Sequence, residues 1–87
     1  MSLSGMKNKE VDYKSRLGGL LREKRGKEYD DGIISQEEYA FRFGINKTYY
    51  GKLERGENNI SLKKLQDISI VLDIPLSELF KQIEESE

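Results

Sequence analysis

The run from residue 35 to residue 56 constrains the fold more than any other part of the chain. Ser35 is a candidate N-cap, and Glu38 follows it by three residues, a capping box that predicts the start of a helix. Gly44 then tolerates the left-handed backbone conformation that commonly ends a helix. Asn46 is the next candidate N-cap and begins a second helix. The run therefore predicts two short helices joined by a glycine turn.

The second helix of this pair is more polar on its outer face than a purely structural helix requires. Its inner face is apolar, with Tyr50 and Leu53 behind Ile45. Ala40 lies where the two helices would approach most closely, and its small side chain permits a steep crossing. Such a pair can set one helix across a DNA backbone and place the next in the major groove.

Three further helices are predicted around this pair, each from apolar residues at three- and four-residue steps. The first starts at Val11 or Tyr13, and the fourth follows the N-cap Ser61 and ends before Asp73-Ile74-Pro75. Their apolar stripes are Leu17, Leu20 and Leu21 in the first helix, Leu62, Leu65, Ile68 and Leu72 in the fourth, and Leu76, Leu79, Phe80 and Ile83 in the fifth. The predicted fold is all-α, a compact five-helix domain.

Gly18 and Gly19 interrupt the first predicted helix, and each costs about 1 kcal/mol in helix propensity. Two interpretations explain them: close packing against a neighbouring helix, or a slightly frayed first turn. The polar stretch 26–33, which holds an Asp-Asp-Gly turn signal, predicts a connection to the second helix.

The composition suits one small helical domain. The chain has 87 residues, enough for one modest core, and 36% of them are charged. A single proline and few β-branched runs favour helices over a sheet. We expect residues 1–10 to be a disordered extension, residues 11–84 to be the domain and residues 85–87 to be an acidic tail.

Missing residue types exclude several chemistries. The chain has no cysteine and no histidine, which excludes disulfides, thiolate metal sites and histidine catalysis, so no metal and no cofactor is expected. No glycine-rich phosphate loop is present, and an enzyme is poorly supported. No stretch approaches the roughly 18 apolar residues of a membrane span, and no signal peptide is evident. We therefore expect a cytoplasmic protein with no membrane partner.

The charge distribution permits a polyanionic partner in spite of a net charge of −1. Nucleic-acid binders are usually basic, so the net charge alone argues mildly against DNA. Residues 1–28, however, carry eight Lys and Arg against four Asp and Glu, whereas residues 73–87 carry one Lys against five acids. The basic N-terminal part can therefore contact phosphate even though the C-terminal end is acidic. The alternative is that these charges only form an ordinary solvated surface.

In order and spacing, five segments resemble the phage-repressor type helix-turn-helix family (lambda repressor and Cro-like, also called the XRE family). They are Ile34–Ala40, Gly44–Ile45, Leu53–Gly56, Ile60–Leu62 and Leu72–Phe80. The resemblance covers about residues 17–80. It implies five short helices, usually acting as a homodimer on a palindromic operator in transcriptional control. The link from Arg25 to Ile34 is about one helical turn longer than is usual in the family.

Candidate DNA contacts lie on the outer face of the second helix of the pair. We predict that Lys47, Thr48 and Lys52 meet base edges, since lysine can donate to guanine and the threonine methyl can meet a thymine methyl. Gly51 shares this face and has no side chain to contact a base. Either it permits close backbone approach to DNA, or its presence here is evolutionary drift without a role. The candidate phosphate contacts are Gln36, whose role the resemblance implies, with Asn46, Tyr49, Arg55, Asn58 and Asn59. The alternatives are a solvated polar face and, for the last two asparagines, a plain turn.

The resemblance also implies two structural features. Arg25 and Glu54 match the family's buried ion pair between the first and third helices. The apolar stripe of the fifth helix is richer than a terminal turn needs, so part of it is a candidate dimer interface, with intramolecular core as the alternative. The residues of this stripe are Leu76, Leu79, Phe80 and Ile83.

The sequence thus predicts a regulator that binds a specific sequence of double-stranded DNA as a homodimer. The alternative is an antitoxin- or controller-like interaction module whose main partner is another protein. In that case the acidic tail or the stretch 26–33 would dock the partner.

Overall fold

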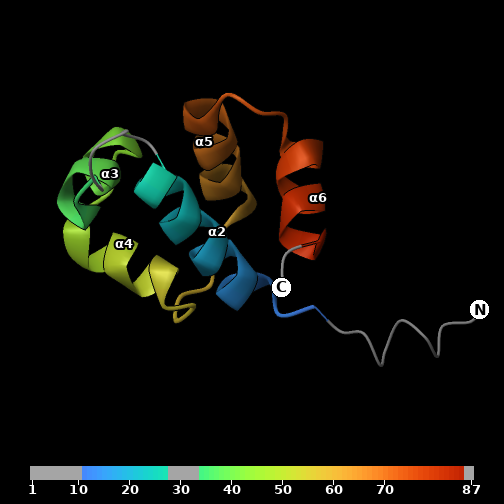
Figure 1. Cartoon of the computed structure of the whole chain (residues 1–87), viewed down its shortest axis with the longest axis horizontal. Coiled ribbons are helices and arrows are strands. Elements are labelled where there is room, and N and C mark those ends of the chain that lie inside the picture. Colours follow the sequence, from blue (N-terminus) through green and yellow to red (C-terminus); the bar gives the residue numbers. More distant parts are fainter. Residues whose placement is uncertain (1–10, 28–33, 86–87) are drawn as a thin grey trace, which may run out of the picture.

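The computed structural model describes residues 11–27 and 34–85, and within them the chain forms five helices and no strand (Figure 1). The helices are α2 (Tyr13–Lys27), α3 (Gln36–Arg42), α4 (Lys47–Glu54), α5 (Leu62–Leu72) and α6 (Leu76–Glu85). The all-α prediction is confirmed. The predicted extension 1–10 and most of the predicted connection 26–33 lie outside the described residues.

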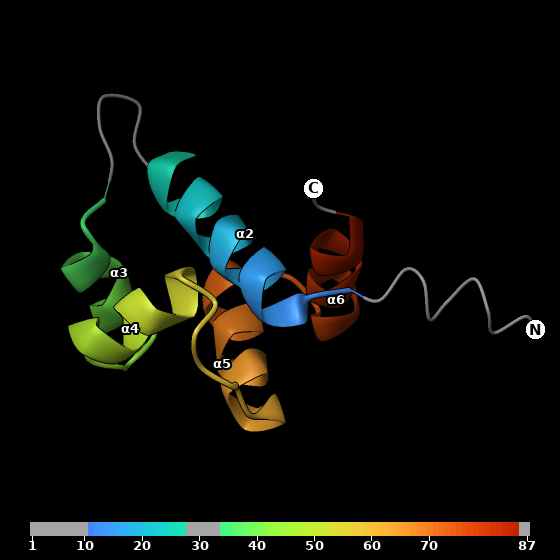
Figure 2. The ribbon, with the colours of Figure 1, turned by 90° about the horizontal axis from the view of Figure 1, so that it is seen from below.

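α2 lies at the centre of the arrangement. It packs against α4 on one side and α6 on the other, while α3 packs on α4 and α5 packs on α6. Figure 2 shows α2 running between the α3–α4 pair and α6. All five helices contribute to one core. Its buried side chains are Leu17, Leu20, Leu21, Ile34, Tyr39, Ala40, Phe43, Tyr50, Leu53, Leu65, Ile68, Leu79 and Ile83.

Three helices begin at the side-chain caps that the sequence predicts. The side chains of Ser35, Asn46 and Ser61 each accept a hydrogen bond from the backbone N–H three residues later, at 3.0, 2.7 and 3.0 Å. Each such cap stabilises its helix by about 1 kcal/mol. Gly44 and Asp73, with φ of 72° and 61°, adopt the left-handed conformation after α3 and α5. These local signals set where α3, α4 and α5 start and where the chain turns.

α2 and α4 approach each other closely at Gly18. A Cβ placed there would lie 2.4 Å from the backbone oxygen of Glu54 and 2.5 Å from that of Leu53. At Gly19 nothing lies within 4 Å of such a Cβ. Close packing is therefore confirmed for Gly18 only, and there it sets the distance between α2 and the end of α4.

Three aromatic rings fill the space between α3 and α4. Tyr39 meets Phe43 edge to face with 4.9 Å between ring centroids, and it meets Tyr50 edge to face at 5.9 Å. Phe43 stacks on Tyr50 at 6.1 Å. Aromatic pairs of this kind contribute about 0.5–1.5 kcal/mol beyond their buried area. The rings thereby hold the two helices of the pair at one angle.

The apolar stripe of α6 is used mainly inside the chain. Leu79 and Ile83 are 0% and 1% exposed, whereas Leu76 and Phe80 are partly buried. A fully buried side chain cannot contact a second copy. The dimer-interface prediction is therefore wrong for Leu79 and Ile83, and it stays a prediction for Leu76 and Phe80.

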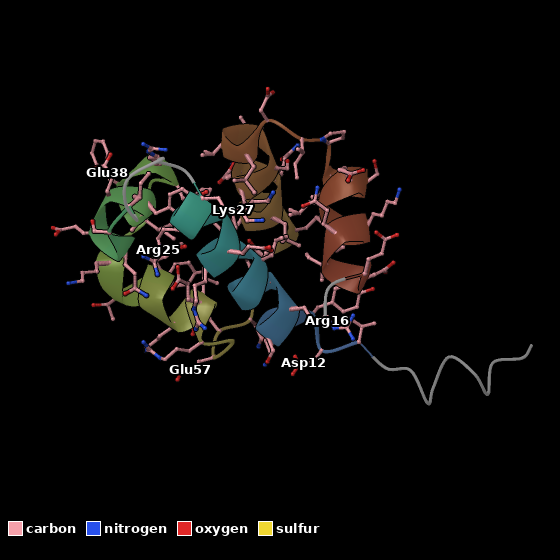
Figure 3. All side chains as sticks on the ribbon, in the orientation of Figure 1. Asp12, Arg16, Arg25, Lys27, Glu38 and Glu57 are labelled. Atoms are coloured by element: carbon pink, nitrogen blue, oxygen red, sulfur yellow. The ribbon has the colours of Figure 1, made fainter. Side chains whose placement is uncertain are left out.

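The C-terminal end of α6 is tied to the start of α2. Arg16 Nη1 donates to the backbone oxygen of Glu84 at 2.8 Å, and the Tyr13 hydroxyl donates to the Glu84 carboxylate. Figure 3 labels Arg16 at this junction. The Tyr13 ring also meets Phe80 edge to face, with 6.1 Å between centroids. These contacts hold α6 against α2.

The exposed apolar side chains include one from the predicted apolar stripe of the fourth helix. Leu62 is 64% exposed, because α5 turns its Leu65 and Ile68 side toward the other helices. Ile70 and Phe41 are also exposed, at 69% and 79%. Among the described helices, none is both long enough and apolar enough to cross a membrane.

Candidate nucleic-acid interface

A shallow groove of about 350 Å³ lies along the outer face of α4. Its lining is Lys47, Thr48, Gly51 and Arg55 from α4 and its C-cap, together with Gln36 from the start of α3. Positions 47, 51 and 55 are four residues apart and therefore lie in a line along one side of the helix. The structure thus brings together five of the residues that the sequence predicts as DNA contacts.

The other predicted contacts lie around this groove or away from it. Lys52 is exposed beside the groove, and Asn46 caps the N-terminus of α4. Tyr49 packs partly against the core, and Asn58 is partly buried in the loop after α4. Asn59 lines a different cleft, whose other walls come from α2, α5 and α6. The position of Asn59 therefore gives no support to its predicted role as a phosphate contact.

A buried carboxylate, Glu54, lies behind the groove. Its side chain is 2% exposed, and its two oxygens accept hydrogen bonds from Nε and Nη2 of Arg25 at 2.6 and 3.0 Å. Arg25 also donates from Nη1 to the backbone oxygen of Ile34 at 2.8 Å. Figure 3 shows Arg25 between α2 and the α3–α4 pair. The ion pair that the resemblance implies is present, and it joins α2 to the end of α4 and to the start of α3.

Hydrogen bonding decides the charge of Glu54. Burial by itself would raise the pKa of Glu54, but the hydrogen bonds from Arg25 and Gln36 outweigh burial and hold this pKa below its ordinary value. Burial also raises the pKa of Tyr50. Among the described residues, the Tyr50 hydroxyl is the one buried side-chain polar atom that has no hydrogen-bond partner. Near neutral pH, Glu54 is therefore a charged and paired carboxylate, and Tyr50 is a neutral phenol. Both groups lie behind the groove.

Gln36 connects this buried pair to the groove. Its Nε2 donates to Glu54 Oε1 at 2.8 Å. Because a carboxylate only accepts hydrogen bonds, the amide nitrogen must face Glu54, and the amide oxygen must face elsewhere. That oxygen lies 3.8 Å from the position of a Cβ placed on Gly51. Gln36 therefore keeps one N–H for the predicted phosphate contact and presents an acceptor beside Gly51.

Glu57 is a residue of this surface that the sequence did not single out. Its carboxylate accepts from Arg55 Nε at 2.9 Å and from Arg55 Nη2 at 3.3 Å. Gly56 between them has a φ of 72°, which turns the chain after α4, and Figure 3 labels Glu57 at this end of the helix. The available sequence signal was the pair of opposite charges two residues apart.

Comparison with known proteins supports this geometry. A family model described as Helix-turn-helix matches residues 21–79, which include α3, α4 and every residue of the groove. The chain belongs to the helix-turn-helix family. The predicted resemblance to its phage-repressor (XRE) type is confirmed. α3 and α4 are the helix-turn-helix itself, the module whose second helix enters the major groove of DNA.

Two individual members of the family resemble the chain over most of its length, and a third resembles it over about half. The control protein C.MunI of Mycoplasma sp is 42% identical over 73 residues, which are 84% of this chain and 95% of that protein. The control protein C.BamHI of Bacillus amyloliquefaciens is 37% identical over 46 residues, 53% of this chain and 57% of that protein. Among solved structures, the restriction-modification controller protein C.AhdI of Aeromonas hydrophila matches with a TM-score of 0.60 and 37% identity, over 78% of this chain and 96% of that one. The matches therefore span nearly the full length of C.MunI and C.AhdI.

Proposed function

We propose that this helix-turn-helix chain is a transcriptional controller of a restriction-modification system, and that it binds a specific DNA sequence through α4. The observation that carries the proposal is its similarity to two controller proteins over 95% and 96% of their lengths. The groove on α4 supports it, because a polar, partly basic recess on a recognition helix suits a DNA edge.

In the proposed complex the polar face of α4 lies in the major groove, and the start of α3 crosses the DNA backbone. Lys47, Thr48 and Lys52 meet base edges. Gln36 and Asn46, which lie at the N-termini of α3 and α4, meet phosphates, since a helix N-terminus favours a negative charge. The phosphate contacts set the register, and the base contacts select the sequence.

We further propose that two copies bind one palindromic operator. The two α4 helices would then enter successive major grooves, with half-site centres roughly 34 Å apart. Leu76 and Phe80 remain the candidate contacts on α6 because both are only partly buried. Analytical ultracentrifugation at micromolar concentration tests this directly. A dimer supports the proposal, whereas a monomer that occupies a single half-site of DNA contradicts it.

In-vitro selection from random duplex DNA tests the whole proposal. Enrichment of an inverted repeat supports a homodimeric regulator. Restriction and methyltransferase genes beside the chain's own gene, with the selected repeat upstream of them, support the controller role. If no sequence is enriched even at low salt, the protein-interaction module becomes the better account and the DNA proposal is abandoned.

The variant Lys52→Ala should relax specificity at one base position. We expect the loss there to be about 1–3 kcal/mol, the usual discrimination of one good side-chain contact to a base edge. Stability should barely change, because Lys52 is exposed. Competition binding with single-base operator variants measures the effect, and Lys63→Ala, on the outside of α5, is the matched control. Identical base preferences in the wild type and Lys52→Ala would rule out the role of Lys52.

A further inference from the structure

The Arg55 side chain turns back along α4. Arg55 is the C-cap residue, yet its Nη1 lies 3.3 Å from the position of a Cβ placed on Gly51, one helical turn earlier. Helical side chains generally point toward the N-terminus of their helix, which explains this direction. Gly51 is buried although it lies in the groove lining, with Arg55 and Gln36 the side chains nearest to it. The guanidinium therefore lies beside the space that a side chain would occupy if residue 51 were not glycine.

Glu57 fixes the orientation of this guanidinium. The carboxylate takes the Nε proton and one Nη2 proton, at 2.9 and 3.3 Å, so it binds the side of the fork. Arg carries five N–H donors in a planar arrangement. Both Nη1 protons and the second Nη2 proton remain, and one Nη1 proton and this Nη2 proton point outward from the end of the fork. This end can still donate two parallel hydrogen bonds.

The pair suits a base edge better than a phosphate. Phosphate binding depends mainly on positive charge, and the Glu57 carboxylate offsets the charge of Arg55. Guanine recognition depends on geometry, because O6 and N7 accept two parallel bonds from one arginine. Lys47 and Thr48, two of the three candidate base contacts, line the same groove. A guanidinium held beside them is therefore placed among base-reading residues.

We propose that Arg55 reads a guanine in the operator, and that Glu57 and Gly51 position it. This assigns Arg55 a role in specificity, where the sequence predicts a phosphate contact. It rests on the proposed function, because it requires α4 to lie in the major groove. Gly51 contributes by leaving space for the guanidinium. Glu57 contributes by binding its Nε side, which leaves the outer end of the guanidinium available to the base.

The test compares wild type, Arg55→Lys, Arg55→Ala, Glu57→Gln and Gly51→Ala by site selection and by binding to the selected operator. Arg55→Lys keeps the charge but loses the planar fork, and it should weaken the operator complex by roughly 5- to 150-fold, with the loss confined to one guanine position. Glu57→Gln should weaken the same complex by up to about fivefold, as expected for an exposed ion pair whose side chains are 53% and 51% exposed. Gly51→Ala should alter the same base position while leaving the fold intact.

Binding to random DNA separates positioning from simple charge. Glu57→Gln removes one negative charge, so its affinity for random DNA should be unchanged or higher even as operator affinity falls. Glu23→Gln, which breaks the exposed Glu23–Lys27 pair on α2, is the matched control for charge and should not change the preferred sequence. Higher operator affinity in Glu57→Gln would overturn the proposal, since Glu57 would then compete with DNA for Arg55.

Two further outcomes would also overturn it. If Arg55→Lys leaves every base preference unchanged, or if Arg55→Ala weakens all sequences equally and lowers the salt dependence, Arg55 is a phosphate contact. In both cases the wild type still selects a sequence, so the proposed function stands while the role of Arg55 fails. A wild type that selects no sequence removes both.

Discussion

Replacing Glu54 with alanine should lower the free energy of unfolding by about 3–5 kcal/mol. The carboxylate is 2% exposed and accepts hydrogen bonds from Arg25 and Gln36. Its removal leaves Arg25, whose side chain is itself only 13% exposed, without its charged partner. Urea unfolding followed by circular dichroism measures the change.

Glu57→Ala is the matched control for this prediction, because it breaks an Arg–Glu pair that lies in solvent. We expect it to change stability by less than about 1 kcal/mol. A loss of similar size in Glu54→Ala would contradict the buried role of the pair. The predicted contrast therefore tests burial and not the presence of an ion pair as such.

The stabilisation by Glu54 should disappear in acid. The pKa of Glu54 in the folded state lies below the ordinary value of 4.5, so the unfolded chain takes up the proton first as the pH falls. Stability from this group is therefore complete above the ordinary pKa and is lost as the pH falls through the folded pKa. The difference in stability between wild type and Glu54→Gln should accordingly narrow in acid, and urea titrations at pH 7 and at pH 3 measure it.

Gly18→Ala should also destabilise the fold strongly, by about 3 kcal/mol, the upper end of the usual cost of overpacking. The added methyl would meet backbone oxygens of Leu53 and Glu54 at 2.5 and 2.4 Å, and backbone cannot rotate aside as a side chain can. α4 would have to move away from α2, so operator binding should weaken as well. Thermal unfolding and operator titration measure the two effects.

The neighbouring residue Gly19 supplies an internal control, because its replacement by alanine should raise stability and not lower it. A Cβ at Gly19 meets nothing within 4 Å, and the position is inside α2. Gly19→Ala should therefore stabilise the protein by about 0.5–1 kcal/mol through helix propensity alone. Equal effects of the two substitutions would mean that α2 and α4 do not pack as closely as described.

The sequence predicted the features that depend on neighbours along the chain. The caps at Ser35, Asn46 and Ser61 and the left-handed turn at Gly44 are local, because each needs only a few consecutive residues in a given conformation. The order of the apolar stripes was enough to predict five helices. The helix-turn-helix assignment followed from the same signals, and the family match confirms it.

Tertiary structure decided which side chains of each face are buried and which meet. Periodicity placed Leu62 and Leu79 in equivalent apolar stripes, yet Leu62 is 64% exposed and Leu79 is 0% exposed, because exposure depends on which side of each helix its neighbours cover. Asn59 is close to Arg55 along the chain but lines another cleft, whereas Gln36, far earlier, lines the groove. Helix patterns along a chain are local, whereas the angle and distance at which two helices cross are set by the side chains of both helices together.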